Sequence, residues 1–101
     1  MTAAEIARAV LELWGGDQSR WIQGAYARSA DGKLAEPTWK NATCWCLIGA
    51  CYRVLDRNLS KGFPEAPALR DALGNRELAS FNDTNSFEVI EAKLREIAGM
   101  A

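Results

Sequence analysis

The chain has 101 residues, of which 49% are hydrophobic and 25% are charged, and its formal net charge is −1. These values are typical of a globular domain with one hydrophobic core, so we expect a single domain over residues 1–101. Basic and acidic side chains are mixed along the whole sequence. Because there is no basic stripe to neutralise phosphates or anionic lipids, neither nucleic acid nor a membrane is an expected partner.

The sequence contains no histidine. This removes the commonest general base, the Ser-His and Cys-His nucleophile pairs, and most transition-metal sites. No phosphate-binding loop, nucleophile elbow or paired-carboxylate motif is present either. We therefore expect no catalytic residues, no metal and no other cofactor, and the chemistry favours a protein that is not an enzyme.

The cysteines and the first ten residues indicate the cellular compartment of the protein. Cys44, Cys46 and Cys51 lie within one apolar segment, and an odd number of thiols there is typical of a reducing cytosol. Residues 1–10 lack the basic start of a signal peptide. We expect a cytoplasmic protein whose cysteines serve as small core residues.

The first predicted element is a helix over residues 3–14. Thr2 and Glu5 have the spacing of a capping box, and Ile6, Val10 and Leu13 recur at helical intervals. Two glycines at 15–16 then end the helix.

A β-hairpin is predicted next, because Asp31-Gly32 is a common turn pair. It would join residues 21–27 to residues 33–36, with Pro37 confined to an edge or loop. Two strands alone are marginally stable, so the hairpin must dock on the helices through Trp21, Tyr26 or Trp39.

The central helix is predicted over residues 42–55, where nearly every side chain is apolar, which is typical of a buried helix. Gly49 within it would let a neighbouring helix approach closely. A short helix over 65–73, a further turn or two over 75–81 and a last helix capped by Asn85 complete the fold. The predicted class is mainly α (α+β): four to five helices around residues 42–55, with one short hairpin at about 21–36.

Six residues are candidates for a ligand or partner site. Trp21, Tyr26 and Trp39 could line a groove, although aromatic residues in a small chain more often belong to the core. Asn82 and Asp83 could orient a ligand, although such residues more often cap a helix, here the last one. Arg28, with Asp31 across the turn, could hold an anion or simply form a solvated hairpin tip.

Three segments occur in an order that resembles a known group of proteins. They are Gly24-x-Tyr26-Ala27-Arg28-x-x-x-Gly32, Cys44-Trp45-Cys46-Leu47-Ile48-Gly49-Ala50, and Phe81-Asn82-Asp83 before Glu88-Val89-Ile90. Together they resemble a family of small uncharacterised bacterial and phage proteins, over about residues 12–98. Such proteins commonly carry Pro-Gly-x-Thr-His after the Asn-Asp pair, whereas this chain has Thr84-Asn85-Ser86-Phe87. Any family activity that depends on that histidine would be absent here.

The expected function is therefore a small cytosolic interaction protein that binds another protein, or a second copy of itself. One specific form is a phage or mobile-element accessory protein that inhibits a host defence system by covering a protein surface. The alternative is a small-ligand-binding protein, or a minor enzyme, that uses Arg28, Asn82 and Asp83. A deep pocket in which these three side chains converge would favour the ligand, whereas an exposed apolar patch would favour a protein partner.

Overall fold

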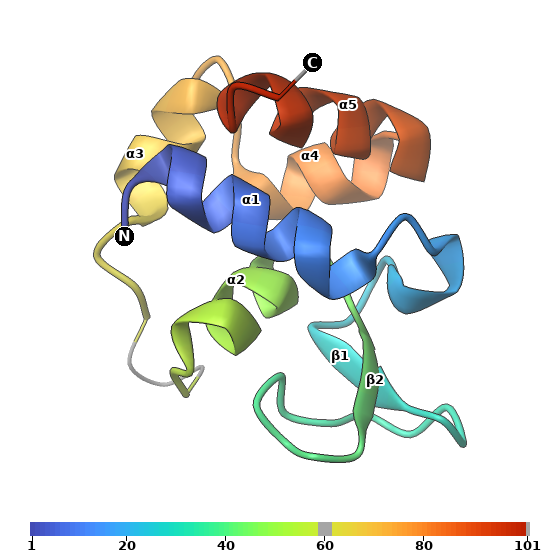
Figure 1. The fold of residues 1–101 in the computed structure, drawn as a ribbon. Helices are drawn as coiled ribbons and strands as arrows, with labels where there is room; N and C mark the ends of the chain where they lie inside the picture. The colour runs from blue at the N-terminus through green and yellow to red at the C-terminus, as the bar shows by residue number, and fades with distance from the viewer. Residues whose placement is uncertain (59–61, 101) are drawn as a thin grey trace.

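The computed structural model describes residues 1–58 and 62–100, in which five α-helices pack together and a two-stranded antiparallel sheet lies at one end of them (Figure 1). This confirms the predicted class, a small α+β domain of five helices and one antiparallel ribbon. In chain order the elements are α1 (Ala3–Trp14), the 3-10 helix η1 (Gln18–Arg20), β1 (Ala27–Ser29), β2 (Ala42–Trp45), α2 (Leu47–Leu55), α3 (Ala66–Ala72), α4 (Leu78–Thr84) and α5 (Phe87–Ile97).

Helix α1 has the bounds that the sequence predicts, and it packs between α2 and α5 (Figure 1). The capping box is formed: the Glu5 N–H donates to Thr2 Oγ1 at 3.1 Å, and the Thr2 N–H donates to Glu5 Oε1 at 2.9 Å. Gly15 ends the helix in the left-handed conformation, with φ of 59°. None of the helices in the described residues is long and apolar enough to cross a membrane.

The core lies where α1 packs against α2 and α5, and where α2 packs against α4. Its members are apolar side chains with little or no exposed surface, drawn from every helix and from the ribbon. The largest fully buried ones are Trp14, Trp45, Ile6, Leu47, Leu69, Leu73, Ile90 and Leu94.

The predicted central helix is wrong over its first turn, because residues 42–45 form β2 and α2 begins only at Leu47. The Trp45 carbonyl accepts from the Trp14 indole Nε1 at 3.2 Å and from the Ile22 N–H at 3.3 Å. A helix starting at Ala42 would use that carbonyl for its own ladder. Long-range partners therefore keep this segment extended, and Cys46 becomes the cap of α2.

The predicted hairpin needs a similar correction. The turn at Asp31-Gly32 is present, with the Gly32 N–H donating to the Ser29 carbonyl at 2.9 Å. Residues 21–26 do not form its first strand, however. The sheet pairs β1 with β2 instead, in the register Ala27 opposite Trp45 and Arg28 opposite Cys44. Residues 33–35 pair with the free side of β1 through the bridge of Arg28 with Leu34, where the Ser29 N–H donates to the Lys33 carbonyl at 2.9 Å and the Ala35 N–H donates to the Ala27 carbonyl at 3.1 Å.

A neighbouring segment does approach Gly49 closely, as predicted, but this segment is the chain before β1 and not a helix. The backbone of Tyr26 crosses directly over Gly49, so that a Cβ at Gly49 would overlap the Tyr26 carbonyl oxygen. The same carbonyl accepts the Cys46 N–H at 3.3 Å. Glycine at 49 therefore lets the chain before β1 lie flat on the first turn of α2.

The caps predicted for the last helix are also wrong. Asn82, Asp83 and Thr84 form the last turn of α4, and Asn85 is the residue that ends this helix. Ser86 caps α5 in place of Asn85, with its Oγ accepting the Val89 N–H at 3.3 Å. Asn82 and Asp83 therefore do not cap the last helix.

Candidate functional site

Asn82 joins three segments that are far apart in the sequence. Its side chain is 1% exposed, and it is the only buried polar or charged side chain in the described part of the chain. Its Oδ1 accepts from the Trp21 indole Nε1 at 2.7 Å and from the Leu47 N–H at 3.0 Å. Its Nδ2 donates to the Ile22 carbonyl at 3.1 Å and to Asp83 Oδ1 at 3.0 Å.

These bonds give Asn82 a capping role at a helix other than the predicted one. The Leu47 N–H is the first of α2 and has no partner within its own helix, so Asn82 Oδ1 satisfies it from outside. All the hydrogen-bonding capacity of one amide side chain is used inside the protein. Asn82 is therefore a structural residue that positions the start of α2.

Trp21 and Gln23 hold the segment before β1 against α4 and α5. The Trp21 ring packs on the Phe87 ring, with centroids 5.8 Å apart, and its indole N–H binds Asn82. Gln23 Nε2 donates to the Asn82 carbonyl at 3.0 Å and to the Asn85 carbonyl at 3.2 Å. Trp21 thus docks the segment before β1 on the helices, which is the structural role that the sequence suggested for it. Phe87 lies in the segment where the family resemblance expects a histidine.

Asp83 lies at the edge of a shallow pocket of about 270 Å³ between the segment before β1, the start of α2 and α4. The pocket is lined by Gly24, Ala25, Tyr26, Cys46, Ile48, Ala79, Asn82 and Asp83. The Cys46 thiol at its base is 7% exposed and accepts the Gly49 N–H at 3.3 Å. Burial raises the pKa of Cys46, and the nearby Asp83 carboxylate acts in the same direction. The thiol is therefore held in its neutral form and is not activated as a nucleophile.

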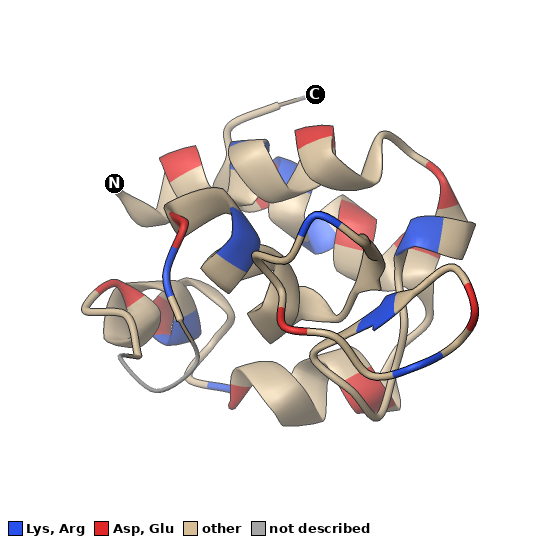
Figure 2. Cartoon of the chain, turned by 90° about the horizontal axis from the view of Figure 1, so that it is seen from below, with Lys and Arg blue, Asp and Glu red and all other residues tan. Residues whose placement is uncertain are grey.

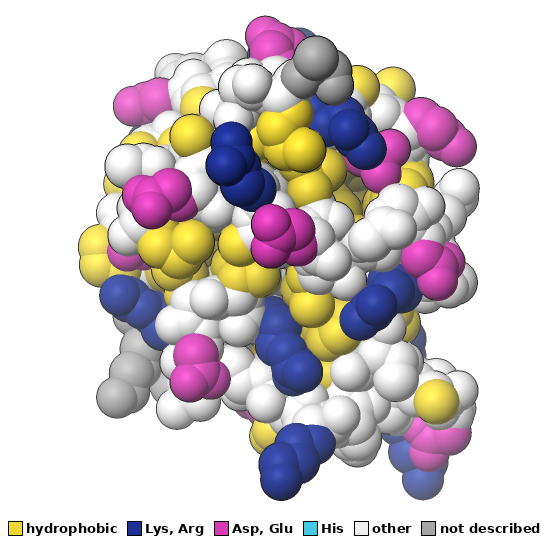
Figure 3. All heavy atoms as spheres, viewed as in Figure 1, with side chains coloured by type: hydrophobic (Ala, Val, Ile, Leu, Met, Phe, Trp, Pro, Cys, Tyr) yellow, Lys and Arg dark blue, Asp and Glu magenta, His cyan; other side chains and the backbone are white. Residues whose placement is uncertain are grey.

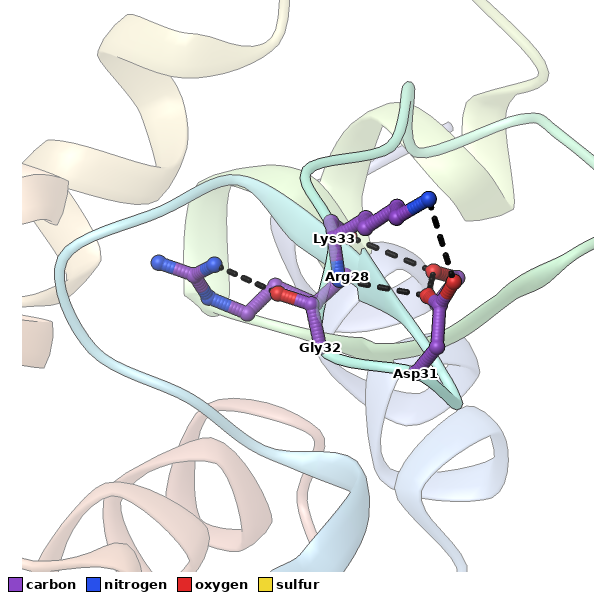
Figure 4. Close-up of polar contacts among 5 residues, drawn as sticks. Arg28, Asp31, Gly32 and Lys33 are labelled. Atoms are coloured by element: carbon purple, nitrogen blue, oxygen red, sulfur yellow. Dashed lines mark hydrogen bonds and ion pairs between the residues drawn. The ribbon is translucent and has the colours of Figure 1, made fainter.

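Arg28 does not line this pocket. Its guanidinium donates to the Gly32 carbonyl at 2.8 Å, so it braces the ribbon turn (Figure 4). Asp31 in the same turn binds Ser29 Oγ and lies 3.9 Å from Lys33 Nζ. The turn is thus tied by its own side chains, and the three residues of the predicted ligand site do not converge.

Three large apolar side chains remain exposed near one another on the ribbon side. Leu34 is 69% exposed, Trp39 is 52% exposed and Tyr26 is 48% exposed. They line an open hollow of about 270 Å³ together with Ala27, Ala35 and Glu36. We call Tyr26, Leu34 and Trp39 the ribbon patch.

The ribbon patch is held on a well-anchored backbone although its side chains are exposed. The Trp39 carbonyl accepts from Arg53 NH1 at 2.8 Å, and the Pro37 carbonyl accepts from the same atom at 3.1 Å and from the Trp45 indole Nε1 at 2.9 Å. The loop between β1 and β2 is thereby fixed to α2 and to the core. The backbone of this loop is presented in a set geometry, so that binding has mainly the side chains to order.

Tyr26 also borders a second groove on the other side. It lines the Asp83 pocket and a neighbouring pocket of about 320 Å³ that reaches Tyr52, Phe63 and Arg70. Tyr26 is therefore the shared wall of three adjoining hollows.

Charge is divided unevenly between the ribbon end and the rest of the protein. Residues 20–53 carry five basic and two acidic side chains, a net charge of +3, whereas the remaining residues carry seven basic and eleven acidic ones, a net charge of −4. Figure 2 views the ribbon end and shows Lys and Arg positions on the ribbon and its connecting loops. On the face shown in Figure 3, by contrast, charges of both signs are interspersed with small apolar areas.

The structure thus distributes the six predicted site residues over several places, with Arg28 in the ribbon turn and Asp83 at the pocket beside Cys46. Trp21 and Asn82 are joined by a hydrogen bond inside the fold, whereas Tyr26 and Trp39 are exposed around one hollow. Leu34, the most exposed of the large apolar residues that the structure describes, is absent from the prediction. Its signal in the sequence was a lone aliphatic residue directly after the turn pair and Lys33. The position of Cys46 beside a pocket was also missed, because a continuous helix was expected over residues 42–55.

No group of three or more His, Cys, Asp or Glu side chains suited to a metal ion is found in residues 1–58 and 62–100. A family model described as a family of unknown function (DUF6197) matches residues 1–99. No curated protein and no solved structure matches the chain.

Proposed function

Since the chain belongs to the DUF6197 family of unknown function, we propose from its own surface that it is a cytosolic, non-enzymatic module that binds another protein through the ribbon patch. The observation that carries the proposal is the exposure of Tyr26, Leu34 and Trp39 around one hollow. Aromatic side chains with little conformational freedom commonly provide the central contacts of protein interfaces.

The surrounding chemistry supports binding rather than catalysis. The chain has no histidine, and the thiol nearest to a pocket, that of Cys46, has a raised pKa. Asn82 already uses its amide atoms in internal hydrogen bonds. A partner that covers the ribbon patch would bury apolar surface without disturbing any of these contacts.

The alternative, a small-ligand site, is supported by the pocket beside Asp83 alone. That pocket contains one carboxylate, a buried neutral thiol and apolar side chains, while Arg28 belongs to the ribbon turn. A ligand held there would rely on Asp83 for its only charged contact. The ribbon patch offers three exposed apolar side chains to a protein partner, so we place the protein-binding proposal first.

The proposal is tested by affinity capture from the native host, with mass spectrometry of the bound proteins. Wild-type protein is compared with the double variant Leu34→Ser, Trp39→Ser. The matched control is Val89→Ser, which removes an apolar side chain of similar exposure, 49%, from α5. We expect a partner that the wild type and the control retain and the double variant loses.

If all three proteins capture the same set, the ribbon patch is not the binding surface. Circular dichroism of each variant shows whether it is folded, which is expected because all three side chains are solvent-exposed. Inhibition of a host defence protein is one specific form of the proposal, and the identity of the captured partner tests it.

A further inference from the structure

We propose that the partner docks on the ribbon patch with an acidic segment that carries a large apolar anchor residue; this inference rests on the proposed function and adds the chemistry of the partner. Two properties coincide at this end of the molecule. The patch offers an apolar hollow, and the chain around it has a net charge of +3 within a protein whose total charge is −1.

The basic side chains stand directly beside the apolar ones. Lys33 precedes Leu34 in the sequence, and Lys40 follows Trp39. Both lysines are exposed, and the one ion pair of Lys33, with Asp31 at 3.9 Å, is between side chains that are 82% and 60% exposed. Such a pair is weak in water and leaves Lys33 available to a partner's carboxylate.

Arg28 on the ribbon and Arg53 on α2 add positive charge to this end of the molecule. Arg28 binds the Gly32 carbonyl and Arg53 binds the carbonyls of Pro37 and Trp39, so both guanidinium groups are used for backbone contacts rather than for ion pairs. Neither guanidinium forms an ion pair with a carboxylate in the described residues, so both positive charges remain uncompensated. An approaching acidic segment would be attracted to Lys33 and Lys40 at the border of the patch, which speeds association and selects against basic partners.

The mixture of contacts favours a polypeptide over a nucleic acid. The hollow contains the aliphatic Leu34 and the acidic Glu36 beside its two aromatic rings. A single-stranded nucleic acid carries a phosphate at every nucleotide, so it could not stack on both rings without bringing charge next to Glu36 and Asp31, whereas a peptide can leave uncharged residues opposite these two carboxylates. An acidic peptide can place an apolar side chain in the hollow and its carboxylates beside Lys33 and Lys40.

The test selects binders without assuming a sequence. The full chain is immobilised and a random-peptide library is enriched on it, after which the best peptide is measured by fluorescence anisotropy against four proteins. These are the wild type, Leu34→Ser with Trp39→Ser, Lys33→Glu with Lys40→Glu, and Val89→Ser as the control. Oligothymidylate is measured in parallel.

We expect the selected peptides to combine Asp or Glu with one Trp, Phe or Leu. The charge-reversed variant should bind about tenfold more weakly, because two exposed attractions become repulsions. Affinity for the wild type should fall as salt is raised from about 0.1 M to about 1 M, over which the screening length shortens from about 10 Å to about 3 Å. Val89→Ser should bind as the wild type does.

The outcomes separate the two proposals. Neutral or basic peptides that bind the patch independently of salt, or full binding by the charge-reversed variant, would overturn the acidic partner and leave the docking surface standing. Failure of Leu34→Ser with Trp39→Ser to weaken binding, or a library that yields no binder, overturns the docking surface as well. Tighter binding of oligothymidylate than of any peptide would replace the acidic segment by a nucleic acid.

Discussion

Gly49→Ala is the substitution that tests the packing of the ribbon on the helices most directly. Gly49 lies in the first turns of α2, under the backbone of Tyr26. An added Cβ would overlap the Tyr26 carbonyl oxygen and lie 2.7 Å from its carbonyl carbon and 3.2 Å from its Cα. A single methyl group therefore requires the two backbones to separate.

The magnitude follows from two opposing terms. Replacing a helical glycine by alanine ordinarily stabilises a protein by about 1 kcal/mol. Overpacking of a rigid site costs roughly 1–3 kcal/mol and can exceed this. The obstacle here is backbone, which cannot rotate away, and moving it would lengthen the hydrogen bond from the Cys46 N–H to the Tyr26 carbonyl, now 3.3 Å. The overpacking cost should therefore lie at or above the upper end of its range, about 3 kcal/mol, and after subtracting the gain of about 1 kcal/mol we expect a net loss of about 2 kcal/mol or more in the free energy of unfolding.

Thermal and urea denaturation measure this loss. For a domain of this size, each kcal/mol should lower Tm by about 4–8 °C. Ser80→Ala on the exposed face of α4 is the control, and it should be neutral or slightly stabilising. A Tm for Gly49→Ala that equals or exceeds that of the wild type would show that Tyr26 does not cross over α2 as described.

Four further outcomes are expected. Asn82→Ala should lower the free energy of unfolding by about 2–5 kcal/mol in urea denaturation, because it leaves the Trp21 indole N–H and the buried Leu47 N–H without an acceptor. Asp83→Ala should cost less than about 1 kcal/mol, because Asp83 is exposed and caps no helix. A thiol reagent should modify the half-buried Cys44 first and the buried Cys46 and Cys51 only on unfolding; rapid labelling of all three in the native protein would contradict the fold. Burial raises the pKa of Cys46 and Cys51, so the unfolded chain releases these protons first and stability should fall as pH rises above about 9, the ordinary thiol value. Cys51→Ala should flatten that decline, and an unchanged slope between pH 9 and 11, in steps of about half a unit, would count against burial as its cause.

The elements predicted best from the sequence are those decided by their own residues. Helix α1 has a complete capping box and a glycine stop, and α5 has a clear apolar stripe, so local chemistry is sufficient for both. The start of α2 is different. A short apolar run fits a buried strand as well as a buried helix, and the choice at 42–45 depends on Trp14 and Ile22, which bind the Trp45 carbonyl from elsewhere in the fold.

The candidate site divides in the same way. That Asn82 is structural could be predicted from its residue type, since a buried amide is commonly a capping group. Which helix it caps could not, because Leu47 is 35 residues away in the sequence. The exposure of Leu34 depends on which segments pack beside it, and its position after the turn pair indicates only that it lies at a ribbon tip.

The bonds of Asn82 also constrain the order in which the chain can fold. This one side chain binds groups that lie 35, 60 and 61 residues earlier in the sequence. During synthesis, the first N–H of α2 and the Trp21 indole must therefore remain hydrated until residue 82 has left the ribosome. Closing such long loops is entropically costly and is recovered only when the helices pack together. The ribbon should thus become ordered late and in one step with α4, so that chains released before residue 82 would expose their core to aggregation and proteolysis.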